Sequence, residues 1–203
     1  MRVEVGFREQ TATTYGFIDL WRRTFSGVPF QQFTATGTQI TATYGASSYG
    51  VDVQGRWEPI PHLSLDLSGD WQHDVYTDFG SLTGLVLQRQ PRLQFRLTPA
   101  YDMPMDWGDL RIFATYTYVG LRYSNNADQQ ILPEYYTLDA GITAELGQHF
   151  EVRLQGSNLT NQLGLTEGNA RIALGSGTGI VTNFEMARPI FGREVSVQLR
   201  YKF

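Results

Sequence analysis

The sequence has no cysteine and a single lysine, Lys202, among its 203 residues. Without cysteine there can be no disulfide framework, no thiolate metal site and no cysteine nucleophile. The three histidines are scattered, and their spacing suits neither a pair of metal ligands nor a catalytic triad. We therefore expect no catalytic residues, no metal site and no cofactor, and we predict that the chain is not an enzyme.

Charge is also scarce, because only 18% of the residues are charged, against about 25% in soluble domains. The net charge is −4, from 16 basic and 20 acidic residues. A nucleic-acid-binding protein usually carries a basic stripe, so we expect no nucleic-acid partner. No apolar run approaches the ~18 residues of a membrane-spanning helix. The first residues lack the apolar stretch of a signal peptide, which leads us to expect the downstream part of a longer protein.

What the sequence does have is a period of two. Near the C-terminus, Val195, Val197, Leu199, Tyr201 and Phe203 alternate with charged or polar residues. Successive strand side chains point to opposite faces, so this segment has one apolar and one polar face. Similar alternation upstream predicts about nine strands in all. They fall near residues 2–8, 14–23, 51–57, 62–78, 92–97, 109–123, 137–146, 150–155 and 194–203.

The connections between these segments are alternately short and long. We expect short turns at 58–61, 103–108 and 147–148. We expect long connections at 24–43, 78–88, 124–133 and 162–191. Barrels of the bacterial outer membrane have tight periplasmic turns on one rim and long loops on the other. A soluble sandwich gives no reason for this order.

A lipid bilayer offers no water to backbone N–H and C=O groups, so a sheet crosses it only as a closed barrel. We therefore predict an all-β fold, a transmembrane antiparallel up-and-down β-barrel whose apolar face meets outer-membrane lipid. Nine is an odd number, whereas bacterial single-chain barrels have even counts. This points to a segment of a larger barrel.

Three short segments resemble motifs of TonB-dependent receptors. Within residues 155–171, the run Asn158-Leu159-Thr160-Asn161 resembles the element that ends the penultimate strand of that family. Residues 187–193, followed by a last strand that ends in the aromatic Phe203, resemble the closure of its barrel. Residues 48–53 resemble one of its internal strands. Each motif is short, but their order and spacing extend over most of the chain.

The resemblance implies that residues 1–203 are about nine C-terminal strands of a 22-stranded barrel with a plugged lumen. Such receptors import iron–siderophore complexes, cobalamin or oligosaccharides across the outer membrane, energised by the TonB–ExbB–ExbD machinery. The family's plug domain and TonB box have no counterpart in this sequence. TonB would act through the plug of the parent protein, and the segment alone should transport nothing.

Two groups of residues are candidates for function. The C-terminal alternation already described, ending in Phe203, resembles the signal by which the barrel-assembly (BAM) machinery recognises its clients; a plain lipid-facing strand is a compatible interpretation. Inward polar residues near the long-loop rim are candidates for contact with a small-molecule or oligosaccharide ligand. These are Asp74, Tyr76, Arg92, Tyr135, Asp139 and Arg171. The simpler interpretation is that lumen positions are polar because they meet water or a plug.

Two alternatives stay open at this point. One is a self-contained small outer-membrane barrel, such as a passive pore or an adhesin, which should have an even strand count and should pair its first strand with its last. The other is a soluble sandwich or lipocalin-like β-barrel binding module, in which the apolar face would point inward. Alternation alone does not distinguish these inversions. The order of the connections and the terminal Phe203 favour the membrane.

Overall fold

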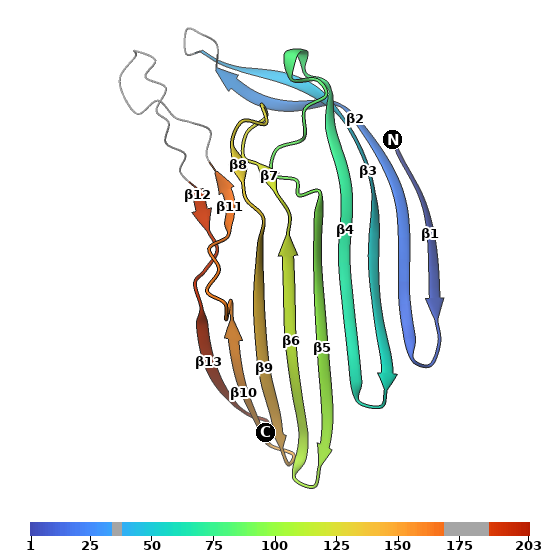
Figure 1. The fold of residues 1–203 in the computed structure, drawn as a ribbon, viewed down its shortest axis with the longest axis vertical. Coiled ribbons are helices and arrows are strands. Elements are labelled where there is room, and N and C mark those ends of the chain that lie inside the picture. The colour runs from blue at the N-terminus through green and yellow to red at the C-terminus, as the bar shows by residue number, and fades with distance from the viewer. Residues whose placement is uncertain (34–37, 169–186) are drawn as a thin grey trace.

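Figure 1 shows the computed structural model of the chain, which describes residues 1–33, 38–168 and 187–203. The described elements are almost all strands, joined by turns and one short 3-10 helix. Their bounds are β1 (Arg2–Gln10), β2 (Thr14–Phe33), β3 (Gln39–Ile60), β4 (Leu63–Asp78), η1 (Gly80–Leu82), β5 (Leu93–Met105), β6 (Gly108–Val119), β7 (Arg122–Tyr123), β8 (Ile131–Leu132), β9 (Tyr135–Leu146), β10 (Phe150–Ser157), β11 (Leu165–Gly168), β12 (Ala187–Pro189) and β13 (Glu194–Tyr201). Within these ranges, no helix is both long and apolar enough to cross a bilayer.

Nine strands form one antiparallel sheet in the order β1-β2-β3-β4-β5-β6-β9-β10-β13. Each strand of the sheet pairs with the one that precedes it in this order, so the sheet is an up-and-down meander (Figure 1). β1 and β13 are its two edge strands. The prediction of about nine strands in an all-β, up-and-down arrangement is confirmed.

The register keeps apolar side chains on one face of the sheet. One row crosses β6, β9, β10 and β13 through Ile112, Ile142, Leu154 and Val197. These side chains are exposed, and Val197 retains 71% of its accessible surface. An apolar face that stays open over so many strands needs a non-aqueous environment, as a lipid bilayer provides.

The opposite face carries the charged and polar rows and is the crowded side of the sheet. Asp19, Trp21, Asp74 and Tyr76 are all buried there, with Trp21 at 5% and Tyr76 at 3% exposure. Side chains crowd together on the inside of a curved sheet and spread apart on the outside, so this face is the interior one. The polar interior and the apolar exterior are the arrangement that the membrane hypothesis requires.

Short turns follow β3, β5 and β9 at one end of the sheet, as predicted, and the long connections after β4, β6 and β10 begin at the other end (Figure 1). The turn between β5 and β6 requires a glycine at its end, at position 108. Gly108 has a φ of +142°, and a Cβ atom there would come within 1.9 Å of the carbonyl oxygen of Glu145. Only glycine fits such a position.

The prediction of a long connection over 24–43 is wrong, because β2 continues to Phe33 and β3 begins at Gln39. The sequence suggested a break because it contains Gly27 and Pro29. A bulge between Phe25 and Val28 accommodates Gly27 at a φ of +65°, and pairing then resumes up to the tip of the hairpin. Bulges bend a strand, and the end of β2 and the start of β3 turn away from the rest of the sheet near the top of Figure 1.

Two of the long connections contain short strands, and β6 ends at Val119, so the end of the predicted strand 109–123 belongs to one of these connections. β7 pairs with β8 within the connection between β6 and β9, and β11 pairs with β12 between β10 and β13. Four or fewer residues make up each of these strands, too few to show an alternating pattern in the sequence. They stand on the long-connection side of the sheet (Figure 1).

Candidate functional site

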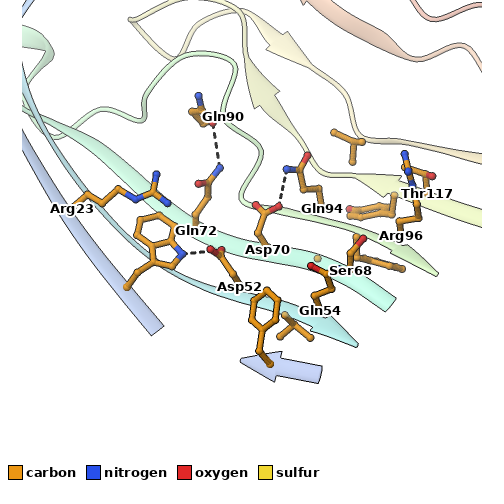
Figure 2. A pocket seen from close by; sticks show the side chains of 17 residues that line it. Arg23, Asp52, Gln54, Ser68, Asp70, Gln72, Gln90, Gln94, Arg96 and Thr117 are labelled. Carbon is orange, nitrogen blue, oxygen red and sulfur yellow. Dashed lines mark hydrogen bonds between the residues drawn. The ribbon is translucent and has the colours of Figure 1, made fainter. Parts of the chain in front are cut away.

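The interior face has a hollow of about 600 Å³ lined by side chains of β2 to β6 and of the connection before β5 (Figure 2). Its lining is rich in amides, carboxylates and guanidinium groups. The polar members are Arg23, Asp52, Gln54, Ser68, Asp70, Gln72, Gln90, Gln94, Arg96 and Thr117. The register brings several of them together in rows across the strands, such as Asp52, Asp70 and Gln94, because residues opposite each other on neighbouring strands share a face.

Asp52 and Asp70 are partners in the β3–β4 register and lie in the middle of this hollow. The indole Nε1 of Trp21 donates a hydrogen bond of 2.8 Å to Asp52, and Nε2 of Gln94 donates one of 2.7 Å to Asp70 (Figure 2). The guanidinium carbon of Arg23 lies 4.1 Å from the centre of the Trp21 ring. The hollow thus presents ordered donors and acceptors, which suits the binding of a polar surface by hydrogen bonds.

The arrangement does not have the geometry of a metal centre. In residues 1–33, 38–168 and 187–203, no three His, Asp or Glu side chains are grouped so that they could hold a metal ion.

A cluster of four aromatic rings lies above the hollow, at the long-loop rim. It consists of Phe30 from β2, Tyr44 from β3, Tyr76 from β4 and Phe79, which follows β4. Ring centres of neighbouring members are 4.6 to 5.9 Å apart. We call these residues the rim aromatic cluster. Of these residues, the sequence pointed only to Tyr76. Phe30 and Phe79 lie in stretches predicted to be connections, 24–43 and 78–88, and Tyr44 lies between the first of them and the next predicted strand.

The structure places the predicted ligand-facing residues in different surroundings. Asp74 and Tyr76 are both buried in the upper part of β4, and the Tyr76 hydroxyl donates a hydrogen bond of 2.8 Å to Asn126. Arg92 lies against Trp71, with its guanidinium carbon 5.7 Å from the ring centre. Because Trp71 belongs to the apolar rows, Arg92 lies on the outward side. Arg171 lies outside the described residues.

Asp139 and Tyr135, both from β9, each support a connection of the rim. Asp139 accepts a hydrogen bond of 2.7 Å from the backbone N–H of Asn158. The Tyr135 ring lies beneath the guanidinium group of Arg122, at 5.2 Å. Asp139 therefore holds the turn after β10 by a hydrogen bond, and Tyr135 holds β7 through its contact with Arg122.

Arg122 is a buried cation, at 4% exposure, outside the nine-stranded sheet. Its Nη1 donates to the carbonyl oxygen of Gly120 at 3.1 Å, and its Nη2 donates to that of Leu165 in β11. Burial lowers the pKa of the Arg122 guanidinium, and Tyr135 partly offsets this effect. The side chain joins two connections that are more than 40 residues apart in the sequence.

Three exposed or half-buried charges continue this link. Glu167 of β11 forms ion pairs with Arg89 at 3.3 Å and with Arg188 of β12 at 2.7 Å. Arg89 also donates a hydrogen bond of 3.2 Å to the carbonyl oxygen of Gly168. We call Arg89, Arg122, Glu167 and Arg188 the rim network. Sequence spacing could not reveal it, because its members come from three connections.

The motifs at residues 158–161 and 187–193 meet in space. The Asn158 side chain donates hydrogen bonds of 3.0 Å to the carbonyl oxygens of Gln162 and Phe191. Asn161 accepts a bond of 3.1 Å from the backbone N–H of Arg193. The end of β10 is therefore fastened to the chain just before β13.

The candidate assembly residues lie on the outward face of the edge strand β13 and just beyond its end. Val195, Val197, Leu199 and Tyr201 are registered with Gly156, Leu154, Val152 and Phe150 of β10. The ring centres of Tyr201 and Phe203 are 5.0 Å apart.

The family model "TonB dependent receptor-like, beta-barrel" matches residues 3–159 of the chain. No curated protein matches the sequence.

Among solved structures, the ferric yersiniabactin uptake receptor FyuA from Yersinia pestis is similar to the chain with a TM-score of 0.83 and 20% sequence identity. The ferric preacinetobactin receptor BauA from Acinetobacter baumannii gives 0.76 and 18%, and the unliganded ferric citrate transporter FecA gives 0.79 and 14%. Each match covers 100% of this chain. The chain spans only 29% of FyuA, 29% of BauA and 31% of FecA. At these identities the likeness concerns the fold.

Proposed function

The chain belongs to the TonB dependent receptor-like β-barrel family, and from this premise we propose that it is part of the wall of an outer-membrane receptor that takes up a scarce ligand. The barrels of this family are transport receptors of the outer membrane rather than enzymes. The observation that carries the proposal is the two-faced sheet. Its outward rows are open and apolar, while its interior presents the hollow around Asp52 and Asp70.

We propose further that residues 1–203 are a C-terminal segment of a 22-stranded barrel. Both edge strands, β1 and β13, carry backbone groups that a bilayer cannot satisfy, so neighbouring strands must cover them. The 29% share of FyuA that the chain spans supports the same idea. Energy from TonB would then reach the barrel through a plug that occupies the polar interior.

Among iron–siderophore complexes, cobalamin and oligosaccharides, we favour a ferric chelate. FyuA and BauA are named as receptors of ferric chelates. The rim aromatic cluster offers flat apolar faces at the mouth of the barrel, and the hollow below it offers hydrogen bonds. A chelate with aromatic or planar groups would stack on the first and be held by the second. Asp74, Tyr76 and Tyr135 remain our candidates for ligand contact.

We also propose that the outward residues of β13, together with Phe203, are recognised by the BAM machinery. Their exposed apolar side chains form a continuous stripe on an edge strand. An exposed edge is suited to strand pairing with another protein before the barrel closes.

The test uses the complete receptor, expressed in bacteria that have an outer membrane but lack other ferric-chelate receptors. We expect radioactive iron from one ferric chelate to accumulate only when TonB is present. Tyr44→Ala in the rim aromatic cluster should raise the half-saturating chelate concentration roughly tenfold, because one stacking partner is lost. Tyr101→Ala, which alters an outward tyrosine, is the matched control and should leave that concentration unchanged.

Accumulation that does not depend on TonB, with uptake of any small solute, would instead identify a passive pore. TonB-dependent uptake of cobalamin or an oligosaccharide, but of no ferric chelate, would retain the receptor and reject the favoured ligand class.

A further inference from the structure

The outward face contains two arginines where the alternation calls for apolar residues. Arg22 of β2 is registered with Val3 of β1 and Tyr49 of β3, in an exposed outward row. Arg92 lies over the outward ring of Trp71. In the part of the chain that the structure describes, neither guanidinium group takes part in a salt bridge. A cation on the lipid-facing side of a barrel is costly unless it meets an anion or lies at an interface.

The two arginines lie at the ends of one continuous surface. A groove of about 570 Å³ is lined by Leu20, Arg22, Tyr49 and Trp71, among others. A second hollow, of about 470 Å³, lies where the sheet ends beside β4; Trp71, His73, Arg92 and Leu93 line its outward side, and Gln72, Asp74 and Gln90 line its interior side. Trp71 belongs to both and joins them.

Aromatic contacts hold this surface together. The Tyr49 ring centre lies 5.8 Å from that of Trp71 and 5.3 Å from that of His73. From β2 to β5 there are three strand spacings, so Arg22 and Arg92 are separated by roughly 14 Å. His73, which is registered with Tyr49, lies between the two, so the surface offers two separate cationic groups to a headgroup with more than one anionic group.

The height of this surface corresponds to a headgroup layer. Trp57, near the short-turn rim, is outward on the same strand as Tyr49 and about eight residues away, or roughly 26 Å along the strand. At a tilt of about 45° this corresponds to roughly 19 Å of height, close to the ~25 Å apolar band between the two aromatic girdles. Trp57 thus marks the periplasmic interface, and Tyr49 and Trp71 mark the outer one.

We propose that Arg22, His73 and Arg92 form a site for the phosphate groups of a phosphorylated lipid of the outer leaflet, whose acyl chains lie along Leu20 and Leu93. The proposal rests on the membrane orientation of the proposed function. Charge complementarity selects the occupant, because guanidinium groups bind phosphate through paired, charge-assisted hydrogen bonds. The stacking of Arg92 on Trp71 holds one guanidinium in place before the lipid arrives. The apolar rows below provide the surface that a free phosphate ion would not use.

The test is a titration of the complete receptor in detergent with lipid A, a glycolipid with two phosphates, followed by native mass spectrometry. We expect the double variant R22Q/R92Q to bind lipid A about a hundredfold more weakly, at roughly tenfold per lost arginine contact. Arg8→Gln is the matched control. Its guanidinium carbon lies 5.6 Å from the Phe17 ring, a similar stacking on the interior face, and its affinity for lipid A should stay unchanged.

Two further ligands complete the test. Lipid A without its phosphates should bind the unaltered receptor as weakly as lipid A binds the double variant, and inorganic phosphate should compete only at far higher concentration. The proposal would be overturned if the double variant bound lipid A as tightly as the unaltered receptor does. It would also be overturned if the unaltered receptor bound the dephosphorylated lipid or inorganic phosphate as tightly as it binds lipid A. Heat-modifiable gel mobility checks that each variant is folded, and R22K/R92K should recover part of the affinity. If the receptor transports its ligand but shows no phosphate-dependent lipid binding, this inference alone fails.

Discussion

Along β9 and β10, pairs of apolar residues on the outward face alternate with polar or small residues on the interior face. The rim connections follow no such period. The sheet is regular because two different surroundings, lipid outside and a polar interior inside, act on alternate residues of each strand. The rim has no such division. It is held by side chains that bond to the backbone of distant segments, as Arg122 does to Leu165 and Asn158 does to Phe191.

The difference shows which changes each region tolerates. In the sheet, the face of a residue matters more than its identity, so an apolar residue can replace another apolar residue. In the rim, a single donor such as the Asn158 amide satisfies several backbone groups at once. Substitutions that reverse polarity should therefore damage the sheet most, and the loss of one specific donor should damage the rim.

The largest effect is expected from a charge on the outward face of β10. Leu154 is registered between Ile142 and Val197 and lies about 9 Å above the aromatic residue Phe150, close to mid-bilayer. We expect Leu154→Arg to lower the free energy of unfolding by about 2–4 kcal/mol. The measurement is the urea midpoint of the complete receptor refolded into lipid vesicles.

The control is the next residue, Gln155, which points to the interior. Gln155→Arg should change the unfolding free energy by no more than about 0.5 kcal/mol. Equal losses for the two variants would mean that the faces are assigned wrongly, and the comparison between sheet and rim would no longer hold.

A smaller effect is expected from Asn158→Ala in the turn after β10. The change removes three side-chain hydrogen bonds, two to Gln162 and one to Phe191. It also places alanine at a φ of +46°, which asparagine tolerates better. We expect a loss of about 2 kcal/mol in unfolding free energy, together with faster proteolysis next to β13. Thr160→Ala, at an exposed position of the same turn, should cause neither, and a normal digestion pattern for Asn158→Ala would refute the fastening role.

The same contrast explains what the sequence could predict. The nine strands and their faces follow from the period of two, which each segment carries within itself. The sequence could not predict that β2 continues past residue 24 or that β3 already begins at Gln39. Both extensions depend on a bulge at Gly27 and on packing of Phe30 against Tyr44. The inward assignment of Arg92 rested on counting along a strand, but Arg92 precedes β5 and lies against Trp71. Partners from separate connections leave no local pattern.

The smallest effect is expected at the exposed edge of the rim network. The Arg188 side chain is 76% exposed, and its 2.7 Å ion pair with Glu167 is surrounded by water. Exposed pairs contribute about 0–1 kcal/mol, and salt screens them over about 8 Å at physiological ionic strength. Arg188→Ala should therefore barely alter hydrogen exchange in β11, whereas Arg122→Ala should speed it markedly, because the carbonyl of Leu165 loses its buried donor. Similar exchange in the two variants would mean that burial does not decide which charge holds the rim together.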